Sequence, residues 1–229
     1  MGRAGEASFS PELTLPSKEG QAMNQSKPKI LILFYSMYGH IFKMTNAVAE
    51  GVREEGGEVI LKQVAELVSE QYWDENVKKA KELMKDIPVA DPQKDLQGID
   101  GLIVGTPTRF GNMTSQMRNF WDQTGADWAE GTLIGKPAAV ITSTATQHGG
   151  QETTIISTML TLLHHGCVVV GFPYSFKEQM TLEEITGGSP YGVSTIAGTQ
   201  GERMPSTNEL KMAKDLGKRL TRIAKKLAL

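Results

Sequence analysis

Cysteine is nearly absent from this 229-residue chain, which contains a single one at position 167. A disulfide framework is therefore excluded, because it needs at least two cysteines. Cys167 precedes three valines on a predicted buried strand. We expect it to be a packed apolar side chain rather than a reactive thiol.

A charge of one sign and a long apolar run are also lacking. The 24 Lys and Arg against 26 Asp and Glu leave a net charge of −2, which gives no field that attracts nucleic acid or an anionic membrane. The longest stretch without these four residues, 153–176, contains two histidines and many threonines, which is typical of a helix followed by a strand. The first 26 residues have no apolar secretion signal. We expect a cytoplasmic protein with no nucleic-acid or membrane partner.

Several motifs of nucleotide and hydrolase chemistry are missing. No G-x-G-x-x-G follows the first apolar strand, and neither G-x-x-x-x-G-K-[ST] nor G-x-S-x-G occurs in the chain. The four histidines, at positions 40, 148, 164 and 165, do not have metal-ligand spacing. These absences argue against an NAD-type Rossmann site, a P-loop and a nucleophile elbow, and no metal site is predicted.

Apolar runs alternate with helical patterns along the chain. The runs predict five buried strands, at 30–34, 58–64, 101–105, 137–143 and 167–171. The last helical pattern, 206–229, begins with a capping box made by Ser206 and Glu209. We therefore predict a single α/β domain over 27–229, with a doubly wound five-stranded parallel sheet and helices on both faces. Residues 1–26 have no apolar period, and a disordered tail is expected there.

Two connections are longer than an α/β unit needs. Residues 66–97 are charged and interrupted by two prolines, which predicts a surface excursion. Residues 172–205 are rich in glycine and proline, and connections of that length usually serve function or assembly. Of two neighbouring tryptophans, Trp121 falls on a helical apolar stripe and is predicted to be core. Trp128 follows a glycine and is predicted to lie in a loop.

Three loops, at 35–40, 106–112 and 144–150, follow predicted strands and are rich in Gly, Ser and Thr without any carboxylate. Ligands of open α/β sheets bind beyond the carboxyl ends of the strands, so we expect these loops to form one crevice. The first loop leads into a helix N-terminus, which favours a phosphate, and Ser36 and His40 are candidate side-chain donors there. An ordinary strand-to-helix turn is the alternative that these residues leave open.

Several segments resemble the WrbA type of FMN-dependent NAD(P)H:quinone oxidoreductases. They are SMYGHI at 36–41, GTPTRFGNM at 105–113, HHG at 164–166, and GGSPYG with TIAG within 187–198. The resemblance covers about residues 29–228. It implies a flavodoxin-like fold, FMN as the cofactor, NADH or NADPH as the electron donor and a quinone as the substrate. It also implies a homotetramer with sites completed by neighbouring subunits, and we expect a homo-oligomer, from dimer to tetramer.

The resemblance also implies roles for residues at matching positions. The FMN phosphate would be held by Ser36, Met37, Tyr38, Gly39, His40 and Ile41. The isoalloxazine ring would lie in the loop of Pro107, Thr108, Arg109, Phe110, Gly111 and Asn112. Its other side would contact Ser143, Thr144, Ala145, Thr146, Gln147 and His148, a run with less glycine than is usual in the family. Tyr38 would lie where the nicotinamide nucleotide approaches, Trp128 would face the quinone, and His164 would contact the flavin or substrate.

The activity that the resemblance implies is the two-electron reduction of quinones to hydroquinones. A hydride would pass from NAD(P)H to FMN and then to a quinone in the same pocket, which gives ping-pong kinetics. Two alternatives stay open. One is a flavodoxin-like electron carrier, although such carriers are usually strongly acidic. The other is an FMN-loaded interaction protein, although no docking motif is found. The residues do not choose between NADH and NADPH.

Overall fold

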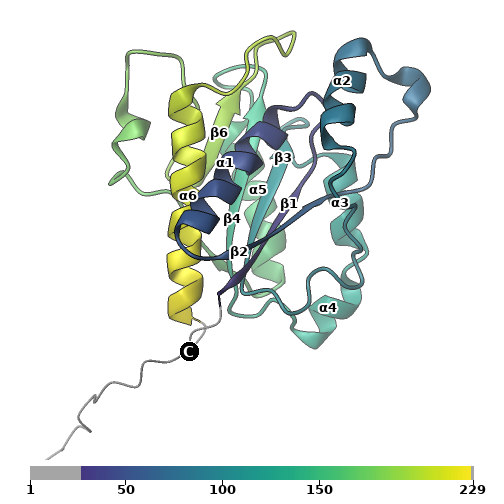
Figure 1. The fold of residues 1–229 in the computed structure, drawn as a ribbon, viewed down its shortest axis with the longest axis vertical. Coiled ribbons are helices and arrows are strands. Elements are labelled where there is room, and N and C mark those ends of the chain that lie inside the picture. Colours follow the sequence, from purple (N-terminus) through teal and green to yellow (C-terminus); the bar gives the residue numbers. More distant parts are fainter. Residues whose placement is uncertain (1–26, 228–229) are drawn as a thin grey trace, which may run out of the picture.

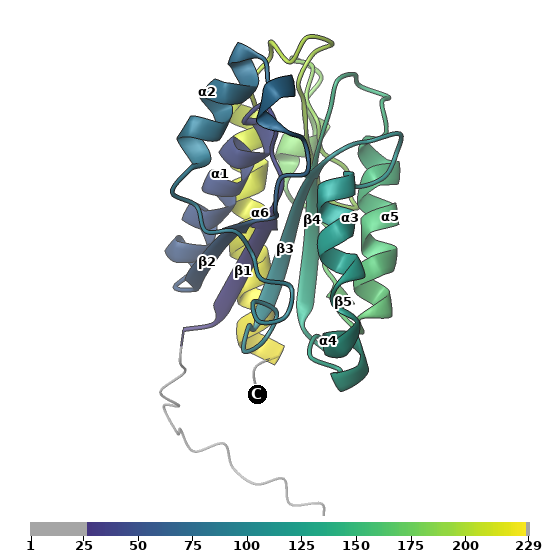
Figure 2. The same cartoon turned by 90° about the vertical axis from the view of Figure 1, so that its right-hand side faces the viewer.

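The computed structural model describes residues 27–227 (Figures 1 and 2), so the predicted tail at 1–26 lies outside the described residues. Its centre is a parallel sheet in the order β2-β1-β3-β4-β5, with β6 also paired to β4. The strands are β1 Lys29–Phe34, β2 Glu58–Gln63, β3 Gly101–Pro107, β4 Pro137–Thr144, β5 Val168–Val169 and β6 Val193–Ile196. The winding reverses between β1 and β3, which confirms the predicted doubly wound sheet.

Helices cover both faces of the sheet, as predicted. On one face lie α1 and α6, and on the other lie α3 and α5 (Figure 2). The α-helices are α1 His40–Glu54, α2 Glu75–Met84, α3 Ser115–Asp122, α4 Gly125–Glu130, α5 Gln151–His164 and α6 Thr207–Leu227. Two 3₁₀ turns, η1 Glu70–Tyr72 and η2 Lys177–Met180, lie in the two long connections. Within residues 27–227, none of the helices has the length and apolar character that a membrane crossing requires.

Two hydrophobic cores lie on opposite faces of the sheet. In β1, Ile30, Ile32 and Phe34 face the α1 and α6 side, while Leu31 and Leu33 face the α3 and α5 side. Burial of both faces explains why the strand is continuously apolar rather than alternating. The second core also contains Cys167 and Trp121, as the sequence predicted, and burial raises the pKa of the Cys167 thiol to about 12.

The two helices on the first face pack backbone to backbone through two glycines. A Cβ atom on Gly51 of α1 would lie 1.9 Å from the carbonyl oxygen of Lys214, and one on Gly217 of α6 would lie 2.3 Å from that of Val48. Neither position has room for a side chain, because real Cβ atoms do not approach backbone so closely. These glycines hold α6, and with it the chain before α6, close to α1.

Two short strands share the edge beside β4. Val168–Val169 pairs with Pro137 and Ala138 at the start of β4, whereas β6 pairs with its end, from Ile141 to Thr144. The predicted fifth strand at 167–171 is therefore regular over two residues only, and the sequence did not predict β6. The chain leaves the sheet after β5 and returns at residue 193, further along the same edge. This return brings the segment after β6 to the carboxyl end of the sheet.

Candidate functional site

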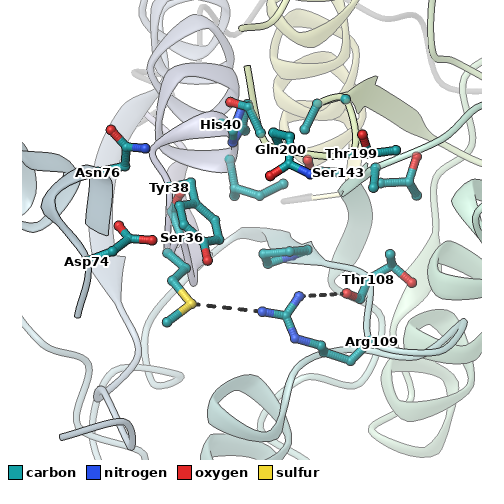
Figure 3. Close-up of a pocket in the computed structure, with 18 residues that line it drawn as sticks. Ser36, Tyr38, His40, Asp74, Asn76, Thr108, Arg109, Ser143, Thr199 and Gln200 are labelled. Carbon is teal, nitrogen blue, oxygen red and sulfur yellow. Dashed lines mark hydrogen bonds between the residues drawn. The ribbon is translucent and has the colours of Figure 1, made fainter. Parts of the chain in front are cut away.

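A cavity of about 370 Å³ opens at the carboxyl ends of β1, β3, β4 and β6 (Figure 3). That volume lies within the range of small-molecule sites, and the position is the point where the winding reverses. Four segments line it together with the start of α2. The lining residues are Ser36, Met37, Tyr38, His40, Ile41, Asp74, Asn76, Pro107, Thr108, Arg109, Ser143, Thr144, Ala145, Ala197, Gly198, Thr199, Gln200 and Gly201. The three loops predicted from the sequence do converge.

The first loop is shaped to receive an anion. Gly39 is the N-cap of α1, has a φ of 89° and supplies no side-chain cap. The Ser36 hydroxyl oxygen accepts the N–H groups of Gly39, at 3.1 Å, and of Phe42, at 3.3 Å. Within residues 27–227, no side chain caps the intervening N–H groups of His40 and Ile41. Free N–H groups at the positive end of a helix dipole fit a phosphate.

His40 lines the cavity and also contacts the segment after β6. Its Nε2 lies 3.1 Å from the carbonyl oxygen of Gly201, and the side chain is buried. Burial lowers the pKa of His40 below its ordinary value, so the ring is neutral at pH 7 and donates from Nε2. His40 therefore ties the first loop to the segment after β6, and its Nε2 is not free to donate to a phosphate.

The second loop carries a cation across the cavity. The Arg109 guanidinium donates to the Thr108 carbonyl oxygen at 2.9 Å and lies 4.0 Å from the Met37 sulfur of the first loop (Figure 3). Arg109 begins a tight turn closed by Asn112, with Phe110 at a φ of 53° and its ring fully exposed. A positive φ is uncommon for an aromatic residue, and such strain gathers at functional sites.

The fourth lining segment, 197–201, was not predicted as part of the site. It is held by Glu209 of α6, a fully buried carboxylate that pairs with Arg203 at 2.9 Å. Glu209 also accepts the Thr195 hydroxyl at 2.8 Å and the Ser206 N–H at 2.8 Å, so the predicted capping box is present. The Arg203 guanidinium donates to the Ile196 carbonyl oxygen at 2.7 Å. The box thus also anchors the chain that follows β6.

Some residues named from the resemblance lie outside the cavity lining of a single chain. The predicted loop position of Trp128 is wrong, because Trp128 lies in the short helix α4. This helix lies at the end of the sheet opposite the cavity in both views (Figures 1 and 2). His164 ends α5 near the start of β5, also at the amino-terminal edge of the sheet. Several others belong to the predicted loops without lining the cavity. They are Gly39, Phe110, Gly111, Asn112, Thr146, Gln147 and His148.

The residues of the cavity fit a flavin mononucleotide. The N–H groups of His40 and Ile41 and the Ser36 hydroxyl suit its phosphate, and backbone-rich strand ends at 107–109 and 143–145 suit a flat ring with carbonyl groups. One carboxylate lines the cavity, that of Asp74, and its Oδ1 accepts the Val77 N–H at 2.8 Å to cap α2. Arg109 and the α1 dipole therefore leave the cavity favourable to an anion.

A family model described as NADPH-dependent FMN reductase matches residues 28–180. The chain belongs to this family. Among similar proteins, an NAD(P)H dehydrogenase (quinone) of Aromatoleum aromaticum is 55% identical over 201 residues, which is 87% of this chain and 97% of that protein. One of Geotalea daltonii is 51% identical over 203 residues, 88% of this chain and 98% of that protein. The match therefore spans nearly the whole length of these relatives.

Solved structures related at lower identity show the fold. A flavodoxin, WrbA-like protein from Agrobacterium tumefaciens superposes with a TM-score of 0.57 at 20% identity, covering 88% of this chain and 99% of that one. Flavodoxin 1 from Bacillus cereus gives a TM-score of 0.53 at 18% identity, covering 85% and 97%. The predicted flavodoxin-like fold of this FMN reductase family member is confirmed.

Proposed function

We propose that the chain is an FMN-dependent NAD(P)H:quinone oxidoreductase that reduces quinones to hydroquinones by two electrons. The observation that carries this proposal is the 55% identity to an NAD(P)H dehydrogenase (quinone) over 97% of that relative's length. The cavity at the carboxyl edge of the sheet supports it, because its donors and charge suit a flavin phosphate and ring. When bound, FMN supplies the hydride chemistry that protein side chains lack, accepting from the nicotinamide and donating to the quinone.

The protein would bind and orient the reactants. In the proposal, Ser36 and the first turn of α1 hold the flavin phosphate, and the strand ends at 107–109 and 143–145 hold the ring. The N–H of Thr108 donates to the Ser143 carbonyl oxygen at 2.9 Å, which links the second loop to the third. Tyr38 lines the cavity and is 41% exposed, and in the proposal it meets the nicotinamide nucleotide. Since donor and acceptor would use one pocket in turn, the kinetics are ping-pong.

Assembly into a homo-oligomer is a second part of the proposal. The outer face of α5 exposes Ile156, Leu160 and Leu163, at helical spacing, and Trp128 and Ile134 are 60% and 69% exposed. Exposed apolar side chains gathered on one face are a common mark of protein interfaces. We propose that in an oligomer this face brings Trp128 of one subunit to the quinone and His164 to the flavin or substrate of a neighbour, the contacts that the family resemblance implies for them. A single buried cysteine agrees with a reducing, cytoplasmic location.

The test is oxidation of NADH and of NADPH by FMN-reconstituted protein, with and without benzoquinone. Rapid oxidation that requires quinone, with parallel double-reciprocal lines, is the expected result. Tight FMN binding without quinone-dependent oxidation would favour the electron carrier instead. Comparison of the two nucleotides at equal concentration also decides the donor preference.

A further inference from the structure

Polar side chains from four separate segments meet behind the first loop and form what we call the Glu66 cluster, made of Tyr35, Glu66, Lys81 and Gln116. The Tyr35 hydroxyl donates to Glu66 Oε2 at 2.9 Å, and Gln116 Nε2 donates to Oε1 at 3.0 Å. Lys81 Nζ pairs with Oε2 at 2.5 Å. Burial opposes ionisation of Glu66, but donation from Lys81, the Val68 N–H and Gln116 holds the pKa of its carboxyl at about 2. The Glu66 carboxylate is therefore ionised at neutral pH.

Lys81 reaches from this cluster to the first loop. Its Nζ donates to the carbonyl oxygen of Ser36 at 3.2 Å and lies 4.8 Å from the centre of the Tyr35 ring. The side chain of Lys81 is only 14% exposed. The Lys81 ammonium has little freedom to move, because it is held by the Ser36 carbonyl, the face of the Tyr35 ring and the Glu66 carboxylate. The orientation of the Ser36 peptide is thereby fixed from behind.

The ion pair is also oriented toward the loop. Within the described residues, Glu66 accepts from Tyr35, Gln116, Lys81 and the N–H groups of its own following residues, and from nothing in 36–41. Lys81 contacts that loop directly. The positive end of the pair is therefore the end that contacts the loop leading into α1. Its field adds to that of the helix dipole at the same place.

We propose that Lys81 is a positioning residue for the flavin phosphate, acting through the Ser36 carbonyl and through its charge. This inference rests on the proposed function, because it assumes a flavin in the cavity. It gives α2 a role in the site beyond the wall residues Asp74 and Asn76 that begin it. A phosphate should sense Lys81, whereas the flavin ring, held by the strand ends at 107–109 and 143–145, should not.

The experiment compares the affinity of apoprotein for FMN and for riboflavin, which lacks the phosphate, by quenching of flavin fluorescence. In Lys81→Met we expect the Kd of FMN to rise about tenfold, as for a partly screened charge near the phosphate, and the Kd of riboflavin to stay within about twofold. Lys81→Arg keeps the charge and should retain most of the preference for FMN. Lys85→Met is the matched control, since Lys85 is the C-cap residue of the same helix and pairs with the exposed Glu82.

The ratio of the two dissociation constants separates a local effect from poor folding, because any unfolded fraction lowers both affinities together. An unchanged FMN affinity in Lys81→Met would overturn the inference, and so would equal weakening of FMN and riboflavin. Failure of the wild-type protein to bind either flavin would instead overturn the proposed function. If the wild-type protein binds FMN and reduces quinone but Lys81→Met leaves the ratio of the two dissociation constants unchanged, the inference about Lys81 is wrong and the proposed function stands.

Discussion

The Nε2 atom of His40 lies 3.1 Å from the carbonyl oxygen of Gly201, which joins the first segment of the cavity to the fourth. A carbonyl oxygen only accepts, so the ring must carry its proton on Nε2. These two residues are 161 positions apart in the chain. The contact therefore makes closure of the cavity depend on the complete fold.

The burial of His40 predicts a loss of stability in mild acid. Burial lowers the pKa of His40, and of the buried His165, below the ordinary value of about 6.5 that applies in the unfolded chain. As the pH falls through that value, the unfolded state takes up protons first, so the free energy of unfolding decreases until the lower folded pKa is passed. Urea unfolding at pH 7.5, 6.5 and 5.5 should show the decrease. His40→Asn should make it shallower, and an identical slope would refute the assignment.

The anchor of the fourth segment predicts a costly substitution at Glu209. Glu209→Gln leaves Arg203 without its charge partner and removes an acceptor shared by several donors, so the free energy of unfolding should fall by about 2–4 kcal/mol. Urea denaturation measures it. Glu178→Gln is the control, because Glu178 pairs with the exposed Lys211, and a change below about 1 kcal/mol is expected. Equal effects of the two substitutions would contradict the role given to Glu209.

The surroundings of two glycines predict opposite effects of Gly→Ala on the free energy of unfolding. Gly51 lies where α1 meets α6, and Gly125 lies in open space. Gly51→Ala places a Cβ against the Lys214 carbonyl and should lower the free energy of unfolding by about 2–3 kcal/mol. Gly125→Ala, at the start of α4 with nothing within 4 Å of the added atom, should raise it by about 0.5–1 kcal/mol. Thermal or urea unfolding of both variants checks the signs. A neutral Gly51→Ala would mean that the helices separate easily.

Arg109 is expected to affect ligands without affecting the fold. Arg109→Ala removes a cation that crosses the cavity, so the Kd of FMN or the KM of NAD(P)H should rise about fivefold. Since the side chain is exposed, the free energy of unfolding should change by less than about 0.5 kcal/mol. Flavin titration, steady-state kinetics and urea unfolding test the three statements. Unaltered FMN affinity together with unaltered turnover would remove Arg109 from the site.

The proposed interface predicts that a charge on α5 disrupts assembly. Leu160 is 56% exposed at the centre of the apolar face, and Leu160→Glu should lower the mass measured by sedimentation toward that of one chain. Leu83→Glu, on α2, is the matched control, because Leu83 is 70% exposed away from that face. A wild-type protein that sediments as a monomer would refute the interface.

Much of this arrangement follows from local sequence pattern. Strands such as β1 are buried on both faces, so they appear as continuous apolar runs, and each is followed by the loop that it positions. Their position at the ends of strands correctly predicted that the three loops meet at one cavity. These features depend on neighbours in the chain, which is why the sequence shows them.

The features that were missed depend on distant contacts. Four residues, Val193–Ile196, become β6 because the end of β4 is free to pair, and no local pattern marks them in a glycine-rich stretch. The lining at 197–201 follows from that pairing and from Glu209. The sequence predicts a loop at Trp128 because a glycine usually ends a helix. Gly125 instead begins a helix of six residues.

The shared edge beside β4 sets the order in which the cavity is assembled during synthesis. The loops after β1, β3 and β4 emerge with strands that pair among themselves. The segment after β6 is anchored only once Glu209 and the rest of α6 exist. A chain that ends before α6 would therefore contain the residues of three walls of the cavity but not the carboxylate that anchors the fourth.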